Sequence, residues 1–548
     1  MLNKRRQYNK KRRLFSIILS LALTFGSMSV AIADEVQLPT PEEIDSMHLL
    51  TPILEAETEA ESETALQALA DLDADGKLLA LAQIAEFAEE QNDSEILIAF
   101  LPYIGEDLMD SLDAITATAI LESNAYIDLF KIYVIDFAHT LDNFSSASYN
   151  EALVDVAMDS SKSDELRVYA AHDIDTSMVS NPVAVYETLY DDASSMDDKM
   201  LMLKDIGFVD PATARELSLD VLDIYESYES RIVTMANKAY VRSINGEQEL
   251  IDDIIARNRE MMATGDSDLI DSCVYALAEL KEPEAVELIF ELDSFDHISG
   301  LYKLVDYNFD GIVDYTAEAG PDSLAKIVEA VPVEEFVPVI ESRIAQRSAN
   351  ALSADLGAEL LNTIELANTE MPTRAASSSN WDGYAVYRDG VEVIGIEINW
   401  HAGIVVQSDS NSTSGIRSIA HHPGGNDTAY TTYSAFVGNN DFMGAYRTTS
   451  DVDIRDEIVA TAKDMVHDAI GYNFFSLIKH NQTNQSGTIA VSNLTHVRCD
   501  GFVEFAYELN DEIIRGANIT TYMGAEADNV RAINQFTPEH QARSMNEV

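Results

Sequence analysis

The chain has 548 residues, with 95 Asp and Glu against 35 Lys and Arg and a formal net charge of −60. Such an acidic balance argues against nucleic acid and anionic membrane surfaces as partners. The apolar content of 46% is too high for a disordered chain, and the length predicts two or three domains.

The first 33 residues have the composition of a secretory signal. MLNKRRQYNKKRR carries seven basic residues and no acidic one, and the apolar run LFSIILSLALTFGSMSVAIA follows it. Ala31-Ile32-Ala33 matches the small-x-small pattern of a cleavage site, so we predict a signal peptide over residues 1–33. An uncleaved signal anchor is the alternative, because the apolar run is almost long enough to span a bilayer. We therefore expect a secreted, extracellular protein, free or associated with the cell surface, with no stable membrane span after cleavage.

Residues 34–375 predict one helix after another. Segments such as ALQALADLDADGKLLALAQIAEFAEE place apolar residues at i, i+3, i+4 and i+7, with short polar breaks between segments. Two stretches, starting at Val168 and Val274, share the order apolar helix, polar turn ending in proline, apolar helix. This order resembles the helix pairs of HEAT-like repeats, which stack into α-solenoids with a concave surface for a protein partner. A non-repetitive helical domain is the alternative. Cys273, flanked by apolar residues at helical spacing, is interpreted as a small buried hydrophobe.

Two acidic segments of this region are candidates for calcium. The first matches EF-hand positions 1, 3, 5 and 9 with Asp306, Asn308, Asp310 and Asp314. Its twelfth position is Ala317, and Glu318 comes one residue too late for the bidentate ligand. The second, residues 71–82, matches still fewer positions. We interpret both as polar turns between helices and expect no cofactor, with calcium as the alternative.

After Thr373 the composition changes, and residues 381–548 predict an α+β domain, joined to the helices by ASSSN (376–380). Asp389-Gly390 lies between two alternating runs and predicts a β-hairpin. HAGIVV and GIRSIAHH predict further strands. The segments 454–470 and 499–509 predict amphipathic helices, the second with Glu504 and Glu508 off its apolar face.

Cys499 opens the last of these helices. The positive end of the helix dipole and the unpaired N–H groups there favour a thiolate, and Arg498 adds to the effect. The alternative is an inert, partly buried thiol. Seven of the 11 histidines follow residue 376, and His401 and His421 lie on predicted strands. A thiol, a base and a group that orients the base are the parts of thiol catalysis.

Zinc is a further alternative for these residues. The spacing of His496 and Cys499, and the adjacent pair His421-His422, match none of the usual ligand pairs. We therefore predict no metal at this site.

RCDGFVEFAYE resembles the DCSGFV segment that carries the nucleophile in NlpC-type cell-wall cysteine peptidases, which have a papain-like fold. The motif order NWHAGIVV, SIAHHPGG, GYNFF, RCDGFV resembles the circularly permuted branch, which includes YiiX-like bacterial hydrolases and the lecithin:retinol acyltransferase group. The resemblance implies Cys499 as nucleophile, His401 as base, and His421, or alternatively His422, as the second polar residue.

The resemblance extends over residues 381–515 and has departures. Tyr472 resembles the tyrosine that precedes the cysteine in the family, at a different spacing. Arg498 replaces the Asp before the nucleophile, and Asp500 replaces the Ser after it.

The resemblance and the signal segment together predict a secreted cysteine hydrolase, an amidase or peptidase acting on cell-wall peptides. The helical repeats are then a docking surface. The alternatives are a catalytically inactive binding or scaffold protein, and a thiol acyltransferase or esterase acting on lipid substrates. A calcium-dependent surface adhesin is a third.

Overall fold

The structure is a computed structural model that describes residues 38–319 and 380–548, apart from gaps at 39, 41–43, 45–47, 57, 92–93, 95, 140–145, 296–297, 391, 394–395, 398–399, 425–427, 483 and 536. The predicted signal peptide (1–33), with Ala31-Ile32-Ala33, lies outside the described residues, as do residues 376–379 of the predicted joint. Across the described ranges, no helix has both the length and the apolar character that crossing a membrane requires.

Residues 51–319 form a succession of helices, as predicted. Their bounds are α3 Thr51–Leu54, α4 Glu59–Ala70, α5 Ala74–Gln91, α6 Ile96–Ser111, α7 Ala114–Glu122, α8 Asp128–His139, α9 Ala147–Met158, α10 Asp164–His172, α11 Pro182–Asp192, α12 Met196–Val209, α13 Pro211–Leu222, α14 Ser230–Arg242, α15 Gln248–Met262, α16 Ser267–Leu280, α17 Pro283–Phe290 and α18 Gly300–Ala319, with a 3-10 turn at Tyr225–Ser227. The two stretches predicted as helix, turn and helix are α10–α11 and α16–α17. Pro182 and Pro283 begin the second helix of each pair, where the missing N–H costs nothing.

The two acidic segments fold differently from each other. Residues 71–73 form a turn between α4 and α5, as predicted, and the Asp73 carboxylate accepts the Gly76 N–H at 3.0 Å. Residues 306–314 instead lie within α18, interrupted only by the non-helical backbone of Asn308 (φ −131°, ψ 34°). An EF-hand needs an open 12-residue loop, which the helical backbone here does not form. The predicted turn between helices is reduced to a kink at Asn308 that joins two helical parts of α18. The side chains of Asp310 and Asp314 lie outside the described residues.

The C-terminal domain contains a six-stranded antiparallel sheet in the order β11-β7-β1-β4-β5-β6. Its strands are β1 Ala385–Asp389, β4 Trp400–Ser408, β5 Ile416–His421, β6 Ala429–Thr431, β7 Phe442–Arg447 and β11 Asn546–Glu547. The smaller elements are β2 Glu392–Val393 paired with β3 Ile396–Glu397, and a sheet of β8 Gly471–Tyr472, β10 Leu494–Val497 and β9 Ile478–His480. The helices are α22 Tyr433–Val437, α23 Val452–Val466, α24 Cys499–Glu508, α25 Tyr522–Gln535 and α26 Pro538–Ala542, with 3-10 turns at Thr413–Gly415 and Val491–Asn493.

The predicted hairpin at Asp389-Gly390 is wrong. β1 pairs with β4 and β7, whereas the run after Gly390 forms the separate hairpin of β2 and β3. The long strand β4 offers β1 five paired residues, more than the two-residue β2 can supply. The predicted α+β class of this domain is confirmed.

The six-stranded sheet has two different faces. Ala402, Ile404 and Ala420 join the main core together with α23 and α24. Val405 and Ile419, one residue along, belong to a smaller core with Phe436 of α22. Side chains alternate along a strand, so β4 divides a face covered by α23 and α24 from a face covered by α22.

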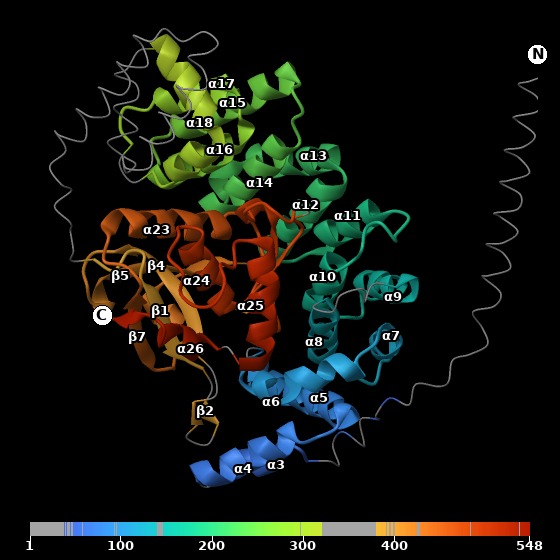
Figure 1. Cartoon of the computed structure of the whole chain (residues 1–548). Helices are drawn as coiled ribbons and strands as arrows, with labels where there is room; N and C mark the ends of the chain where they lie inside the picture. Colours follow the sequence, from blue (N-terminus) through green and yellow to red (C-terminus); the bar gives the residue numbers. More distant parts are fainter. Residues whose placement is uncertain are drawn as a thin grey trace, which may run out of the picture.

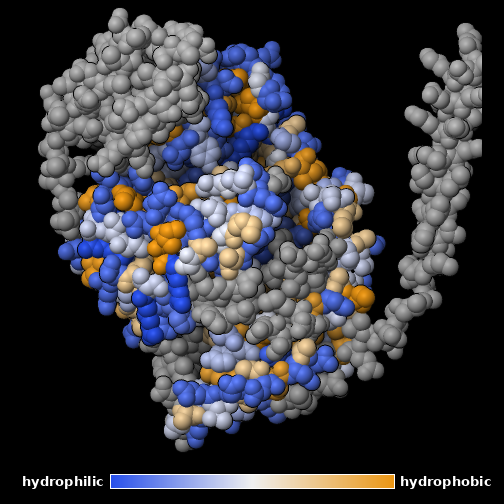
Figure 2. Space-filling model, in the orientation of Figure 1, coloured by the Kyte–Doolittle hydropathy of each residue, from blue (hydrophilic) through white to orange (hydrophobic). Residues whose placement is uncertain are grey.

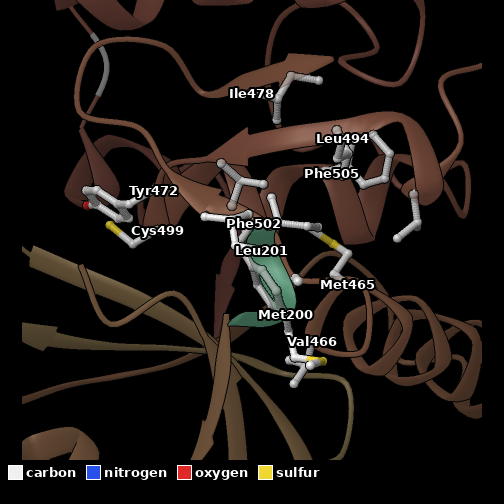
Figure 3. Close-up of a cluster of buried hydrophobic side chains, with 14 of the residues drawn as sticks. Met200, Leu201, Met465, Val466, Tyr472, Ile478, Leu494, Cys499, Phe502 and Phe505 are labelled. Carbon is white, nitrogen blue, oxygen red and sulfur yellow. The ribbon is translucent and has the colours of Figure 1, made fainter. Parts of the chain in front are cut away.

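The helical region curves around the C-terminal domain (Figure 1). Every second helix from α8 to α18 contacts this domain through a side chain, and the helices between them form an outer layer. The main core is continuous across the two regions: Met200 and Leu201 of α12 lie beside Met465 and Val466 of α23 (Figure 3). The concave side of the stack is thus used within the chain. The visible outer surface is mostly hydrophilic (Figure 2).

Buried ion pairs hold the two regions together. Asp464 of α23 accepts Lys238 at 2.6 Å and Lys303 at 2.8 Å. Asp468, just after α23, accepts Arg242 at 2.7 Å, and Asp136 of α8 accepts Lys479 at 2.7 Å. Apart from the Arg242 side chain, which is about a quarter exposed, these charged groups are almost entirely excluded from solvent, so undocking would expose several charges that now neutralise one another.

Candidate active site

Cys499 is the first residue of α24, as predicted. Arg498 is the N-cap and caps no N–H with its side chain, whereas the Asp500 carboxylate accepts the Gly501 N–H at 3.0 Å. Cys499 is fully buried, in contact with the main core. The whole of α24 is buried with it, including Glu504 and Glu508, so the prediction of one polar face for this helix is wrong.

Arg498 and Asp500, the two departures beside the thiol, bind each other. The Arg498 Nε donates to Asp500 Oδ1 at 2.6 Å and its second nitrogen donates to Oδ2 at 2.8 Å. Both side chains are fully buried. Burial alone would lower the pKa of Arg498, but the Asp500 carboxylate outweighs it and raises that pKa. The acid next to Cys499 is therefore neutralised by its own neighbour.

Only glycine fits at position 501, because α24 packs closely on a neighbouring backbone. A Cβ at this position would lie 1.9 Å from the Leu477 carbonyl oxygen. The start of α24 thus packs directly on the backbone before β9, and any side chain here would collide with it.

Tyr472 lies beside Cys499 (Figure 3). Parallel pairing of Val497 with Tyr472 brings the chain just before the thiol alongside this tyrosine. The Tyr472 ring also meets the ring of His422 edge-on, with centroids 4.8 Å apart. The sequence resemblance that drew attention to Tyr472 thus selected a neighbour of the thiol.

His401 and His421 form a buried pair. Nε2 of His401 lies 2.7 Å from Nδ1 of His421, and both rings contact Phe436 of α22. Burial holds the pKa of His421 well below its ordinary value, and His401, His422 and Arg388 lower it further. A neutral His421 can accept a hydrogen bond at Nδ1 from the Nε2–H of His401. Gly403 is required nearby, because a Cβ there would lie 2.8 Å from Ile419 and 3.1 Å from the His421 Cβ.

The thiol and the imidazole pair lie at the same end of the sheet, on opposite faces. His401 pairs with Arg388, whose guanidinium lies over Phe436, and this is the α22 face. The next pair, Ala402 and Tyr387, faces α24. Tyr387 reaches the start of α24 through one residue: its hydroxyl donates to Gln541, which donates to the Asp500 carbonyl, each at 2.8 Å.

His422 lies on the same face as Cys499. Its Nε2 is 2.9 Å from the Ile470 carbonyl, and the Gly424 N–H approaches its Nδ1 at 3.4 Å. His421 and His422, although adjacent in the chain, therefore point to opposite faces of the sheet. One histidine completes the imidazole pair, and the other packs against Tyr472 on the thiol side of the sheet.

A cluster of three buried carboxylates was not predicted. Oxygen atoms of Glu504, Glu508 and Asp528 all lie within 4.8 Å of one another, the one metal-type grouping among the described residues. Burial raises the pKa of Glu508 to about 7, although the Ile519 and Ile514 N–H groups bind its carboxylate and oppose this. Three oxygen donors suit a hard cation such as Ca²⁺, but two backbone N–H groups already hold Glu508. A shared proton fits these contacts. The i, i+4 spacing of Glu504 and Glu508 could have indicated that these two carboxylates are neighbours. Nothing in the sequence indicated that Asp528 of α25 would join them.

Cys273 and His496 pack against other side chains in the interior of the protein. Cys273 is fully buried in α16, and burial raises the pKa of its thiol, which confirms the interpretation as an inert hydrophobe. His496 packs on the ring of His172 with centroids 4.3 Å apart.

Comparison with protein-family models, curated proteins and solved structures finds no match to this chain. The fold establishes the class at a coarse level: a helical region wrapped around an α+β domain. The chemistry rests on the geometry at the start of α24.

Proposed function

We propose that this protein is a secreted cysteine hydrolase of amide bonds, an amidase or peptidase with Cys499 as nucleophile and His401 as base. The observation that carries the proposal is the His401–His421 hydrogen bond of 2.7 Å at the end of the sheet where α24 begins. The proposal retains the permuted papain-like assignment of residues 381–548 and the HEAT-like assignment of the helical region.

The roles follow from the contacts. Nδ1 of His401 takes the thiol proton, and Nε2–H of His401 donates to the neutral His421. The thiolate attacks the amide carbonyl, and the N–H groups at the start of α24 hold the oxyanion. The C–N bond breaks as His401 returns the proton to the leaving amine. Water then cleaves the thioester.

Two features set a condition on this mechanism. Cys499 is fully buried, and the imidazole pair is on the other side of β4. The substrate must therefore displace the groups that cover the thiol. The imidazole of His401 must also move past Trp400, the first residue of β4, to reach the face of the sheet on which Cys499 lies. His422 is the alternative base, because it needs no change of face.

The substrate class we propose is a cell-wall peptide, with a lipid ester or acyl amide as the alternative. The concave side of the stack contacts the C-terminal domain, so a partner would dock on the outer helices. No calcium or other cofactor has a part in these steps.

Hydrolysis assays on cell-wall peptide fragments and on a short-chain lipid ester test the proposal. The experiment compares the parent with Cys499→Ser, His401→Ala and His422→Ala, and uses Cys273→Ser as the matched thiol control. We expect Cys499→Ser to abolish turnover, His401→Ala to reduce kcat by at least 100-fold, and Cys273→Ser to keep it. Turnover that survives Cys499→Ser contradicts the proposal, and a selective loss with His422→Ala would reassign the base.

A catalytically inactive binding or scaffold protein is the second candidate. It is favoured by one observation, the burial of Cys499 in the main core. Capture of a wall fragment with equal affinity by the parent, Cys499→Ser and His401→Ala, without turnover, would establish this candidate and exclude the first.

A further inference from the structure

A cavity of about 500 Å³ lies between the helical region and the C-terminal domain. Helices α14, α16 and the start of α18 line one side, and β4, β5, β6 and α23 line the other. This volume is in the usual range for small-molecule sites, which often occur between domains. The part of β4 that lines it, Val406 and Gln407, is about 13 Å along the strand from Ala402 near the thiol.

The charge of the lining is acidic. Four carboxylates line the cavity: Asp268, Asp271, Asp382 and Asp456. Among the described lining residues, Lys463 is the only ammonium or guanidinium group. Its Nζ is 3.4 Å from Asp271 Oδ2, so one acid is already partly neutralised. The cavity therefore favours a cationic ligand.

Two of these carboxylates, the buried Asp271 and the half-buried Asp382, are held in place before any ligand arrives. Asp271 accepts the Gly300 N–H and the Ser299 hydroxyl, each at 2.7 Å. Asp382 accepts the Ser408 hydroxyl at 2.7 Å and the Asn380 amide at 2.8 Å. Fixed carboxylates lose little entropy on binding, which is the general advantage of a preorganised site.

The remaining lining argues for an organic cation over a metal ion. Tyr302, Tyr430 and Phe295 offer aromatic surface, on which an ammonium group is stabilised. Ser230, Ser267 and Ser418 offer hydroxyl groups to a polar ligand. A cavity of about 500 Å³ is also far larger than a single ion.

We propose that this interdomain cavity binds a small, hydroxylated molecule that carries a primary ammonium group. The ammonium lies between Asp268 and Asp382, and the hydroxyl groups of the ligand meet the serines. This site is separate from Cys499 and does not depend on the hydrolase proposal.

The test is calorimetric titration of the full chain with glucosamine, with N-acetylglucosamine as the matched probe without the ammonium. We expect millimolar or tighter binding of glucosamine and at least tenfold weaker binding of the acetylated sugar. Asp268→Asn and Asp382→Asn should each weaken glucosamine binding by about 5-fold or more. Asp252→Asn, an exposed change on α15, should leave it unchanged, and so should Cys499→Ser.

Three results would overturn the inference. They are equal binding of the two sugars, unchanged affinity in both Asp268→Asn and Asp382→Asn, and binding of calcium chloride that excludes glucosamine. Asp268 is exposed at the first turn of α16, so its variant is expected to fold and keeps the test valid if Asp382→Asn does not.

Discussion

Arg498 and Asp500 form a two-point ion pair across Cys499, with both side chains fully buried. Asp500→Asn would leave the guanidinium buried without its countercharge. We expect a loss of about 3 to 5 kcal/mol in the free energy of unfolding, measured by urea denaturation. The exposed pair Arg417–Asp409 is the control, where Asp409→Asn should leave the free energy of unfolding almost unchanged. Equal effects at the two sites would contradict the neutralisation of Asp500.

A substitution at Gly501 tests whether α24 packs directly on the backbone of Leu477. Gly501→Ala should destabilise the protein by several kcal/mol, because the new Cβ would lie 1.9 Å from the Leu477 carbonyl oxygen. Gly207→Ala in α12 is the control: its nearest neighbour is 3.8 Å away. Alanine is the better helix former, so that change should stabilise by up to about 1 kcal/mol. A neutral Gly501→Ala would show that α24 does not approach this backbone.

Asp464 links the two regions of the chain through Lys238 and Lys303. Asp464→Asn would leave two buried ammonium groups with fewer countercharges, at a cost of about 3 to 5 kcal/mol. We expect a lower thermal midpoint and faster proteolysis between the helical region and residue 380. Arg259→Met, which removes the exposed Arg259–Glu291 pair, should change neither. An unchanged protease pattern in Asp464→Asn would mean that this contact does not hold the regions together.

Glu508 gives the protein a defined pH dependence. Its pKa is raised to about 7 in the folded chain, so the folded state binds a proton more tightly than the unfolded state does. The stabilisation is complete below the ordinary pKa of a glutamate and is lost as the pH rises through about 7. Denaturation at a series of pH values should show stability falling over that window by on the order of 2 to 3 kcal/mol.

Glu508→Gln should flatten the pH profile, since the amide stays neutral throughout. Glu512→Gln, a change at a half-buried position in the turn after α24, should leave the slope of the parent profile. A parent profile without a slope between pH 4.5 and 7 would contradict the account of the carboxylate cluster.

Local patterns in the sequence predicted the helices, the strands around His401 and His421, and the start of α24, because each depends on side-chain periodicity over a few residues. Partners distant in sequence were not predictable. The pairing of β1 with β4 overrides the turn signal of Asp389-Gly390. Glu504 and Glu508 seemed solvent-facing because the covering helix α25 follows in the chain and leaves no trace in α24 itself.

The same limit applies to the candidate site. The sequence could place His401, His421 and Cys499 on a strand, a strand and a helix. Only the register of β4 with β5 and the contact between the two rings show that His401 and His421 share the α22 face. The contact of His422 with Tyr472 places His422 on the face of the thiol. A shift of one residue along the strand exchanges the faces of His421 and His422, so the sequence alone could not decide which of them is the partner of His401.

The reactivity of Cys499 tests the central claim most directly, and Cys273 in the same chain is its internal control. The measurement is the rate of alkylation by iodoacetamide at each cysteine, followed by mass spectrometry between pH 5 and 9 in the parent and in His401→Ala. The account predicts that Cys499 is alkylated at neutral pH, that Cys273 stays unlabelled, and that His401→Ala slows the alkylation of Cys499 at least 10-fold. A Cys499 as unreactive as Cys273, or equally reactive without His401, would contradict it.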